Sequence, residues 1–206
     1  MRKIPPNEAD GSRGPADHVI RERIVCAASE HFSRYGYGKT TVSDLAKAIG
    51  FSKAYIYRFF ESKQAIGEII VAHSLAEIRE EVMAELVSAN SSTEKLRRLI
   101  KSMPSVTAEL IFSDRNLFDI ARYASFECWK PAVGHYEQLR LLVEKIVVEG
   151  RERGEFERKT PLDEVVRSIF YAVSGFADPI NLERNLERMP NGPVDLAGLV
   201  LRSLAP

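Results

Sequence analysis

Cysteine is scarce in this chain of 206 residues, which contains only Cys26 and Cys128, about a hundred positions apart. Neither has a second thiol nearby, so the sequence shows neither a disulfide framework nor the cysteine spacing of a metal site. Long apolar runs are also missing. No apolar segment typical of a signal peptide follows the N-terminal charges, and no stretch reaches the length of a membrane-spanning helix. We therefore expect a cytoplasmic protein that does not contact a membrane.

Catalytic motifs are absent as well. The sequence shows no Ser/His/Asp order, no Gly-rich phosphate loop and no pair of carboxylates arranged as general acid and base. Its four histidines are too scattered to form a set of metal ligands: His18, His31, His73 and His135. We expect a protein that is not an enzyme and that needs no metal or cofactor.

The charge balance is even overall but uneven along the chain. Residues 1–65 hold 11 basic against 7 acidic side chains, a net charge of +4, and the remaining residues hold 18 against 22, a net charge of −4. A basic N-terminal part beside an acidic remainder is expected if only the first part meets a polyanion such as DNA. The hydrophobic share of 45% is enough for a sizeable core.

The strongest local pattern is TTVSDLAKAIGFSKAYIYRFFESK, residues 40–63. Thr41 is a good N-cap, and Asp44 three positions later completes a capping box. Gly50 can end this helix because glycine readily adopts positive φ. Ser52 caps a second helix almost at once, and two short helices around so tight a turn predict a helix-turn-helix. The apolar face of the first helix consists of Val42, Leu45, Ala46 and Ile49.

The second helix of this motif carries more long polar and aromatic side chains than a small buried helix needs. Ala54, Ile56 and Phe60 are available for packing. Several of the others are expected to face outward, toward phosphates or base edges of DNA. They are Lys53, Tyr55, Tyr57 and Arg58.

Residues 40–63 resemble the DNA-binding signature of the TetR family of transcriptional regulators. The shared features are paired threonines, Ile/Leu-Ala before a glycine turn, Ser-Lys, a hydrophobic-Tyr pair, an aromatic-Phe pair and a second Ser-Lys. Residues 24–36, with Ala27, Ala28 and Phe32 before Tyr35-Gly36, are similar to the first helix of that family. Tyr55 departs from the pattern, which often has a small residue such as threonine there, and we expect the larger side chain to change base readout.

The resemblance implies an all-α fold with an N-terminal three-helix, homeodomain-like helix-turn-helix domain and a C-terminal helical domain for effector binding and dimerisation. We place a flexible arm at residues 1–16, the DNA-binding domain at 17–64 and the C-terminal domain at 65–206, with a connector helix at about 62–88. By resemblance, the residues nearer the base edges are Ala54, Tyr55 and Arg58. Those that anchor the DNA backbone are Thr40, Thr41, Lys53, Tyr57 and Lys63.

Apolar residues return at helical spacing through the rest of the chain. The connector would span on the order of 38 Å, longer than a DNA-binding unit needs, so it is expected to reach a second core. Pro104 predicts a break between two short helices, because proline interrupts the backbone hydrogen bonds of a helix. Further helices are expected at about 117–129, 132–153, 161–177 and 194–204.

The segment 117–129 predicts the effector pocket. Phe118, Arg122, Phe126 and Trp129 recur at intervals of four, four and three, so that an arginine lies within an aromatic stripe and can orient a polar group of a ligand. In the alternative interpretation, Arg122 pairs with a nearby carboxylate and the aromatic residues fill the core. We expect a small apolar or aromatic effector, bound by Phe118, Arg122, Phe126, Trp129, Tyr136 and Phe170.

The last two large helices carry apolar stripes that suit the four-helix dimer interface of the resembled family. The expected interface residues are Val166, Phe170, Val173, Leu196, Leu199 and Val200. Two helix-turn-helix units related by a two-fold axis read a palindromic site in double-stranded DNA. The sequence therefore predicts a homodimeric repressor that a small molecule releases from a palindromic operator.

Two alternatives stay open. A redox-responsive DNA-binding regulator would switch through Cys128 or Cys26, although both lie on apolar helical faces, where a cysteine is usually buried and inert. An all-helical small-molecule binding protein would have kept the helix-turn-helix only as a scaffold.

Overall fold

The protein is all-α, as predicted: the computed structural model describes residues 15–113 and 115–206, and these ranges contain no strand. Residues 15 and 16 already belong to the first helix; the rest of the predicted arm lies outside the described residues. The elements are α1 (Pro15–Tyr35), α2 (Val42–Ile49), α3 (Lys53–Tyr57), α4 (Lys63–Val87), α5 (Ser92–Phe112), α6 (Arg115–Phe126), α7 (Lys130–Glu152), α8 (Leu162–Ala177), α9 (Pro179–Asn185), η1 (Leu186–Arg188) and α10 (Asn191–Ser203).

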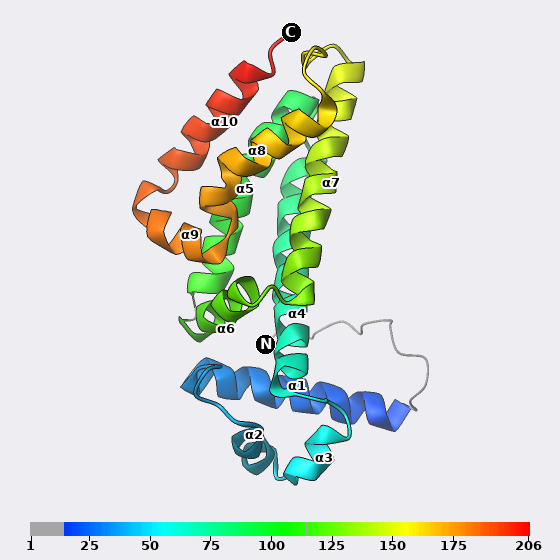
Figure 1. Ribbon diagram of the computed structural model, residues 1–206, viewed down its shortest axis with the longest axis vertical. Coiled ribbons are helices and arrows are strands. Elements are labelled where there is room, and N and C mark those ends of the chain that lie inside the picture. The colour runs from blue at the N-terminus through cyan, green and yellow to red at the C-terminus, as the bar shows by residue number, and fades with distance from the viewer. Residues whose placement is uncertain (1–14, 114) are drawn as a thin grey trace.

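Helix α4 runs through both parts of the molecule (Figure 1). Its first turns lie against α1, below which α2 and α3 form the end of the molecule. Its later turns pack against α5 and α7, while α8 and α10 cover the other side of α5. Helix α6 lies at the waist, in contact with α1, α4 and α7. The predicted connector is thus present as a single helix.

The first hydrophobic core, here called the N-terminal cluster, joins α1 to α4 with parts of α6 and α7. Ile24, Leu45 and Ile56 are fully buried in it, one each from α1, α2 and α3. Four residues more than fifty positions beyond the helix-turn-helix also belong to it. They are Ile120, Ala124, Trp129 and Ala132. The helix-turn-helix therefore shares its core with helices of the C-terminal part.

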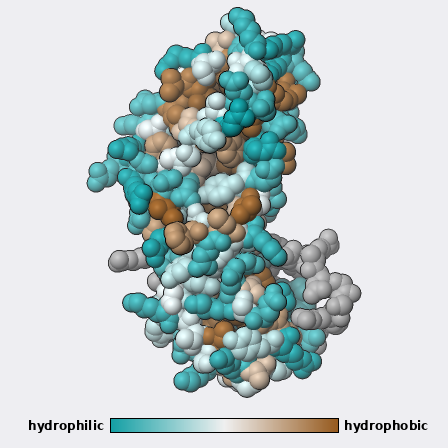
Figure 2. Space-filling model, in the orientation of Figure 1, coloured by the Kyte–Doolittle hydropathy of each residue, from teal (hydrophilic) through white to brown (hydrophobic). Residues whose placement is uncertain are grey.

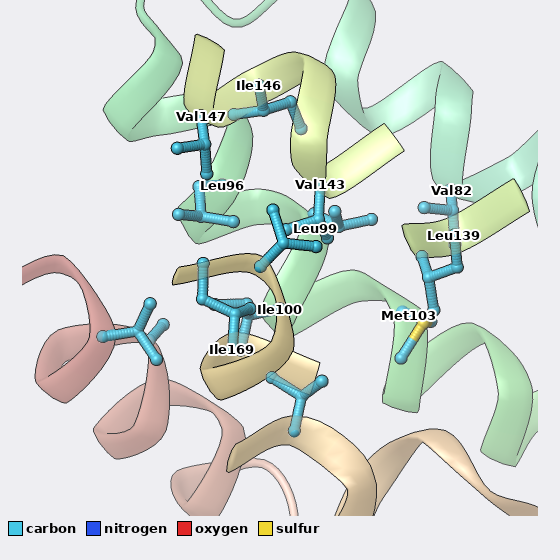
Figure 3. Close-up of a cluster of buried hydrophobic side chains, with 14 of the residues drawn as sticks. Val82, Leu96, Leu99, Ile100, Met103, Leu139, Val143, Ile146, Val147 and Ile169 are labelled. Atoms are coloured by element: carbon cyan, nitrogen blue, oxygen red, sulfur yellow. The ribbon is translucent and has the colours of Figure 1, made fainter. Parts of the chain in front are cut away.

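The second core, the C-terminal cluster, lies where α4, α5, α7 and α8 meet (Figure 3). Full burial of each such aliphatic side chain contributes about 1.5–3 kcal/mol to folding. The labelled residues come mainly from α5 and α7, with one each from α4 and α8: Leu96, Leu99, Ile100, Met103, Leu139, Val143, Ile146, Val147, Val82 and Ile169. Figure 2 shows apolar residues gathered over the C-terminal part and the waist, while the visible face of the N-terminal part is more polar.

The break predicted at Pro104 is wrong. Helix α5 continues through this residue from Ser92 to Phe112. Pro104 is fully buried, so packing on the C-terminal cluster outweighs the hydrogen bond that proline removes, a loss that costs about 3 kcal/mol in a helix interior. Ser105 satisfies a neighbouring carbonyl, since its Oγ donates to the oxygen of Lys101 at 3.2 Å.

The predicted helix 117–129 ends earlier, at Phe126. Cys128 has a φ of 52°, in the left-handed region, and this turn directs Trp129 into the interior, where only 1% of it is exposed. The expectation that the cysteines are buried is also wrong, because Cys26 and Cys128 are both exposed. Burial therefore does not argue against a redox switch through either cysteine, and the redox-responsive regulator stays a prediction.

The segment after α8 contains a helix, α9, that the spacing of apolar residues did not predict. Asp178 caps α9, its Oδ1 accepting hydrogen bonds from the backbone N–H groups of Ile180 and Asn181 at 3.0 and 3.1 Å. The sequence contains a signal for this helix, because Asp178 is a good N-cap residue and proline, here Pro179, is common at the first position of a helix. Helix α10 also begins at Asn191, before the predicted residue 194. Among the described helices, none is both long and apolar enough to cross a bilayer.

Gly67 gives a test of how closely the two parts are packed. A Cβ added to Gly67 would lie 2.9 Å from the Trp129 ring and 3.0 Å from Tyr37, whereas one added to Gly134 would meet nothing within 4 Å. Each glycine is the fifth residue of its helix. We expect Gly67→Ala to lower the free energy of unfolding by about 1–3 kcal/mol through overpacking. The matched Gly134→Ala should raise it by about 0.5–1 kcal/mol, because alanine favours helix. Urea unfolding of both variants measures this, and a stabilised Gly67→Ala would contradict the packing described.

Candidate DNA interface and effector cavity

The tight turn of the helix-turn-helix is fixed by caps at both ends, as the sequence predicted. Thr41 Oγ1 accepts from the N–H of Asp44 at 3.2 Å, and Asp44 Oδ2 accepts from the N–H of Thr41 at 3.0 Å. The Thr41 hydroxyl also donates to Asp44 Oδ2 at 2.6 Å, and this bond, together with the one from the Thr41 N–H, lowers the pKa of Asp44. Gly50 has a φ of 76°, and the N–H of Phe51 reaches back to the oxygen of Ala46 at 2.9 Å. This Schellman-type ending turns the chain directly into α3.

One buried residue anchors α3, and most of its other side chains face solvent. Ile56 is fully buried in the N-terminal cluster, and Ser52 caps the helix by accepting from the N–H of Tyr55 at 3.1 Å. Four of the predicted contact residues are exposed on this short helix and its C-terminal end: Lys53, Ala54, Tyr57 and Arg58. The helix thus presents two cations and a phenol to the outside, groups that bind phosphates and base edges.

Thr40 and Lys63 point inward instead. Only 3% of Thr40 is exposed, and its Oγ1 donates to the oxygen of Gly36 at 2.8 Å. Lys63 Nζ donates to the carbonyl oxygens of Tyr37 and Thr40 at 2.9 and 3.0 Å and lies 4.1 Å from the Tyr37 ring centroid. Partial burial lowers the pKa of Lys63. Both residues hold the α1–α2 connection in place, so a direct DNA contact by either stays a prediction.

Tyr55 also packs inward in part. Its ring makes edge contacts with Phe51 and Phe59 at centroid distances of 5.0 and 5.3 Å, and the residue is half-buried. Thr41 is exposed, but its hydroxyl is engaged with Asp44. Lys39, which the sequence pattern did not single out, is exposed directly before the two threonines. A cation next to a helix N-terminus was the available signal, and we add Lys39 to the candidate interface.

The C-terminal part contains a cavity of about 330 Å³ between α4, α5 and α7. Its polar residues are Arg79 on α4 and His135 and Gln138 on α7. The apolar wall consists of Ile78, Val82, Met83, Met103, Leu139 and Leu142. Burial, with a further contribution from Arg79, lowers the pKa of His135 to about 4, so its imidazole is neutral at pH 7. A mostly apolar cavity of this size with a few polar groups is typical of a small-molecule site.

Of the six residues predicted for the effector pocket, the structure places only Tyr136 on a described cavity, a smaller one of about 40 Å³. Trp129 belongs to the N-terminal cluster, and Phe126 is 81% exposed at the end of α6. Arg122 lies outside, 3.5 Å from Asp119, as its alternative interpretation had it. Phe118 and Phe170 pack against the C-terminal cluster. The aromatic stripe is divided among three environments because α6 ends before Trp129.

Tyr136 belongs to a polar group beside the smaller cavity. Its hydroxyl donates to Asp178 Oδ2 at 3.1 Å, and the hydroxyl of Ser125 donates to the same oxygen. Burial raises the pKa of Tyr136, and the Asp178 carboxylate raises it further. These bonds connect α6, α7 and the start of α9. Within residues 15–113 and 115–206, no group of three or more histidine, cysteine or acidic side chains is placed to hold a metal ion.

The predicted interface residues are mostly turned toward their own protomer. Val166, Val173 and Val200 are buried, and Phe170 and Leu196 pack against the C-terminal cluster. Leu199 alone of the six is well exposed, at 58%. The apolar stripes of α8 and α10 therefore cover the protomer core. Tyr171 and Leu199 lie on the outer sides of these two helices, which pack against each other.

Comparison with known families agrees with this arrangement. The model described as "Bacterial regulatory proteins, tetR family" matches residues 24–68, and the one described as "Tetracyclin repressor-like, C-terminal domain" matches residues 92–189. The chain belongs to the TetR family of transcriptional regulators.

Relatives of this TetR regulator include the uncharacterised HTH-type transcriptional regulator YdgC of Bacillus subtilis, which is 22% identical over 79% of this chain and 86% of its own length. The biofilm operon icaADBC negative transcriptional regulator IcaR of Staphylococcus aureus is 30% identical over 39% of this chain and 44% of its own length. This second match spans less than half of either protein.

Solved structures share the fold at low sequence identity. The fatty acid degradation regulator FadR of Bacillus halodurans has a TM-score of 0.61 and 19% identity, covering 93% of this chain and 95% of its own. A transcriptional regulator of Saccharomonospora viridis in complex with choline has a TM-score of 0.60 and 21% identity, covering 89% of this chain and 94% of its own. At such identities the likeness shows the fold alone.

Lys53 and Lys63 allow a matched test of which lysines face DNA. Lys53→Ala should weaken binding to any duplex and reduce the dependence of log affinity on log salt by about 1, because one phosphate contact is lost. Lys63→Ala should leave that slope unchanged and lower the free energy of unfolding by about 1–3 kcal/mol, because two carbonyl groups lose their donor. Salt-dependent fluorescence anisotropy and urea unfolding measure the two effects. A flattened slope in Lys63→Ala would support the direct DNA contact that the sequence predicts for Lys63.

Proposed function

We propose that this TetR-family regulator is a homodimeric repressor that leaves a palindromic operator when a small molecule binds its C-terminal part. The observation that carries the proposal is the α3 surface, where a buried Ile56 fixes a helix whose Lys53, Tyr57 and Arg58 side chains are exposed. Arg58 and the half-buried Tyr55 lie nearest the base edges in this proposal, and Lys39, Lys53 and Tyr57 contact the backbone. Such a regulator acts in the cytoplasm, where its DNA lies.

The proposed dimer uses the outer sides of α8 and α10. Tyr171 on α8 is 74% exposed and Leu199 on α10 is 58% exposed, so each helix leaves a large apolar side chain for a partner to cover. Ala172 and Gly198 lie next to them in sequence, and such small residues let another helix approach closely. A two-fold axis at this surface would present two α3 helices to major grooves about 34–36 Å apart, or a multiple of that distance.

Helix α4 offers a route from effector to DNA. Its residues Ile78 and Arg79 line the cavity, and its first turns pack in the N-terminal cluster with the helix-turn-helix. Gly67 of α4 lies against Trp129, which directly precedes α7, the opposite wall of the cavity. A ligand that separates α4 from α7 would therefore move the helix-turn-helix and change the distance between the two DNA-reading helices of a dimer.

Selection of fragments from random duplex DNA tests the proposed function. We expect the purified protein to enrich a palindrome whose affinity falls steeply as salt rises, because many phosphate contacts release counterions. Reporter expression from a promoter that carries the selected site distinguishes repression from activation. Failure to enrich any sequence, with protein shown to be folded and free of ligand, would favour a binding protein that has kept the helix-turn-helix only as a scaffold.

Placing a charged side chain on the proposed dimer surface tests it. Leu199→Arg should shift the protein from dimer to monomer in analytical ultracentrifugation and lower operator affinity at least tenfold, because a cation is buried without a partner. Leu141→Arg is the control, since Leu141 on α7 is similarly exposed, at 50%, but lies outside the proposed interface. A dimer that withstands Leu199→Arg would place the interface elsewhere.

A further inference from the structure

We propose that the cavity between α4, α5 and α7 binds an amphipathic carboxylate, whose acid group pairs with Arg79 and whose hydrocarbon part fills the apolar wall. The inference deepens the proposed function and rests on it only in taking the ligand to be the effector. It concerns a site distinct from the aromatic residues singled out in the sequence.

The wall of the cavity sets the character of the ligand. Six of the nine lining residues are apolar, and they come from all three helices that enclose the space. Val82, Met103 and Leu139 are almost fully buried, so the deep end belongs to the C-terminal cluster. A hydrocarbon chain that enters this space leaves water for an apolar surface, which favours binding through the hydrophobic effect.

Arg79 sets the charge of the ligand. Arg79 is an exposed residue of the cavity wall. Its Nη1 donates a hydrogen bond to Oε1 of Gln138, from α4 to α7, at 2.5 Å. Within the described part of the chain, no carboxylate forms an ion pair with Arg79. Arg140, two residues after Gln138 on α7, by contrast forms ion pairs with Glu137 at 2.8 Å and with Glu144 at 2.9 Å. A guanidinium whose partner is a neutral amide can accept a ligand carboxylate in a bidentate, charge-assisted pair.

The other polar groups fit the same ligand. His135 is neutral at pH 7, so it adds no charge of its own, and a neutral imidazole can donate to a carboxylate oxygen. None of the nine lining residues is acidic, so a cationic ligand would meet Arg79 without any counter-charge. The cavity therefore favours an anion over an amine of the same shape.

Binding would also break a contact between helices. The Arg79–Gln138 hydrogen bond joins α4 to α7. A carboxylate that pairs with the Arg79 guanidinium would replace Gln138 as its partner and so break this bond. The chain of the ligand then lies between Ile78 and Leu142, on opposite walls. The predicted result is a displacement of α4 relative to α7, which the ring of Trp129 at their other junction would report.

Three probes of equal chain length test the charge preference: decanoate and decylamine below their micelle-forming concentrations, and methyl decanoate below its solubility limit. Calorimetric titration of the full-length protein should give a dissociation constant for decanoate at least tenfold below those of the ester and the amine. Emission from Trp129, the single tryptophan of the chain, should change with the same midpoint. Equal affinity for the three probes, or no binding of any, would overturn the inference.

Variants locate the site. Arg79→Gln should raise the dissociation constant for decanoate at least tenfold and leave that for methyl decanoate within twofold, while Arg79→Lys should retain part of the preference because the charge stays. Arg140→Gln is the matched control and should change neither. Leu142→Phe should weaken both the acid and the ester by filling the cavity. A preference that survives Arg79→Gln, or a Leu142→Phe variant that binds as the wild type does, would show that the ligand lies elsewhere.

The outcomes are separable from those for the proposed function. Selection of DNA without ligand decides whether the protein reads a sequence, and the titrations above contain no DNA. Folding of each variant is checked by its circular dichroism and thermal transition. Operator binding together with no carboxylate preference would overturn this inference alone, whereas carboxylate binding without any enriched sequence would overturn the DNA-binding role alone.

Discussion

The contact between Trp129 and Gly67 holds the two parts of this molecule in one arrangement. Because Gly67 has no side chain, the indole ring lies where a Cβ would come within 2.9 Å of it. The same ring packs edge-on against Tyr37 at a centroid distance of 5.2 Å. Lys63 covers Tyr37 with its ammonium and ties down the carbonyl oxygens of the α1–α2 connection. The position of the helix-turn-helix thus depends on a residue from the turn before α7.

This arrangement makes α4 a part of both cores. Its first turns contribute Ile66 and Ile70 to the N-terminal cluster, and its later turns contribute Ile78 and Val82 to the C-terminal cluster. A helix packed at both ends cannot shift at one without disturbing the other, because cores packed at crystal-like density transmit strain. The cavity lies beside the second half of α4, so an effector there would act on the element that carries the DNA-reading unit.

The sequence predicted the helix-turn-helix well because its determinants are local. Thr41, Asp44, Gly50 and Ser52 act through hydrogen bonds and backbone angles within a few residues of themselves, and the structure shows each in its predicted role. The same reasoning failed at Pro104, where burial outweighs the intrinsic preference of proline. The effector-pocket assignment stays a prediction, and helical spacing alone did not anticipate that the α6–α7 turn at Cys128 sends Trp129 into the N-terminal cluster.

The sequence by itself determined the family, the all-α class, the long connector and the tight turn, because these depend on caps, glycine and the spacing of apolar residues along single helices. The tertiary structure alone decided which side chains are exposed to a partner. Thr40, Lys63 and Val166 suit an interface by type and spacing but are engaged within the protomer, whereas Arg79, Lys39 and Tyr171 are exposed. The physical reason is that exposure is set by neighbouring helices, which segments distant in the sequence supply.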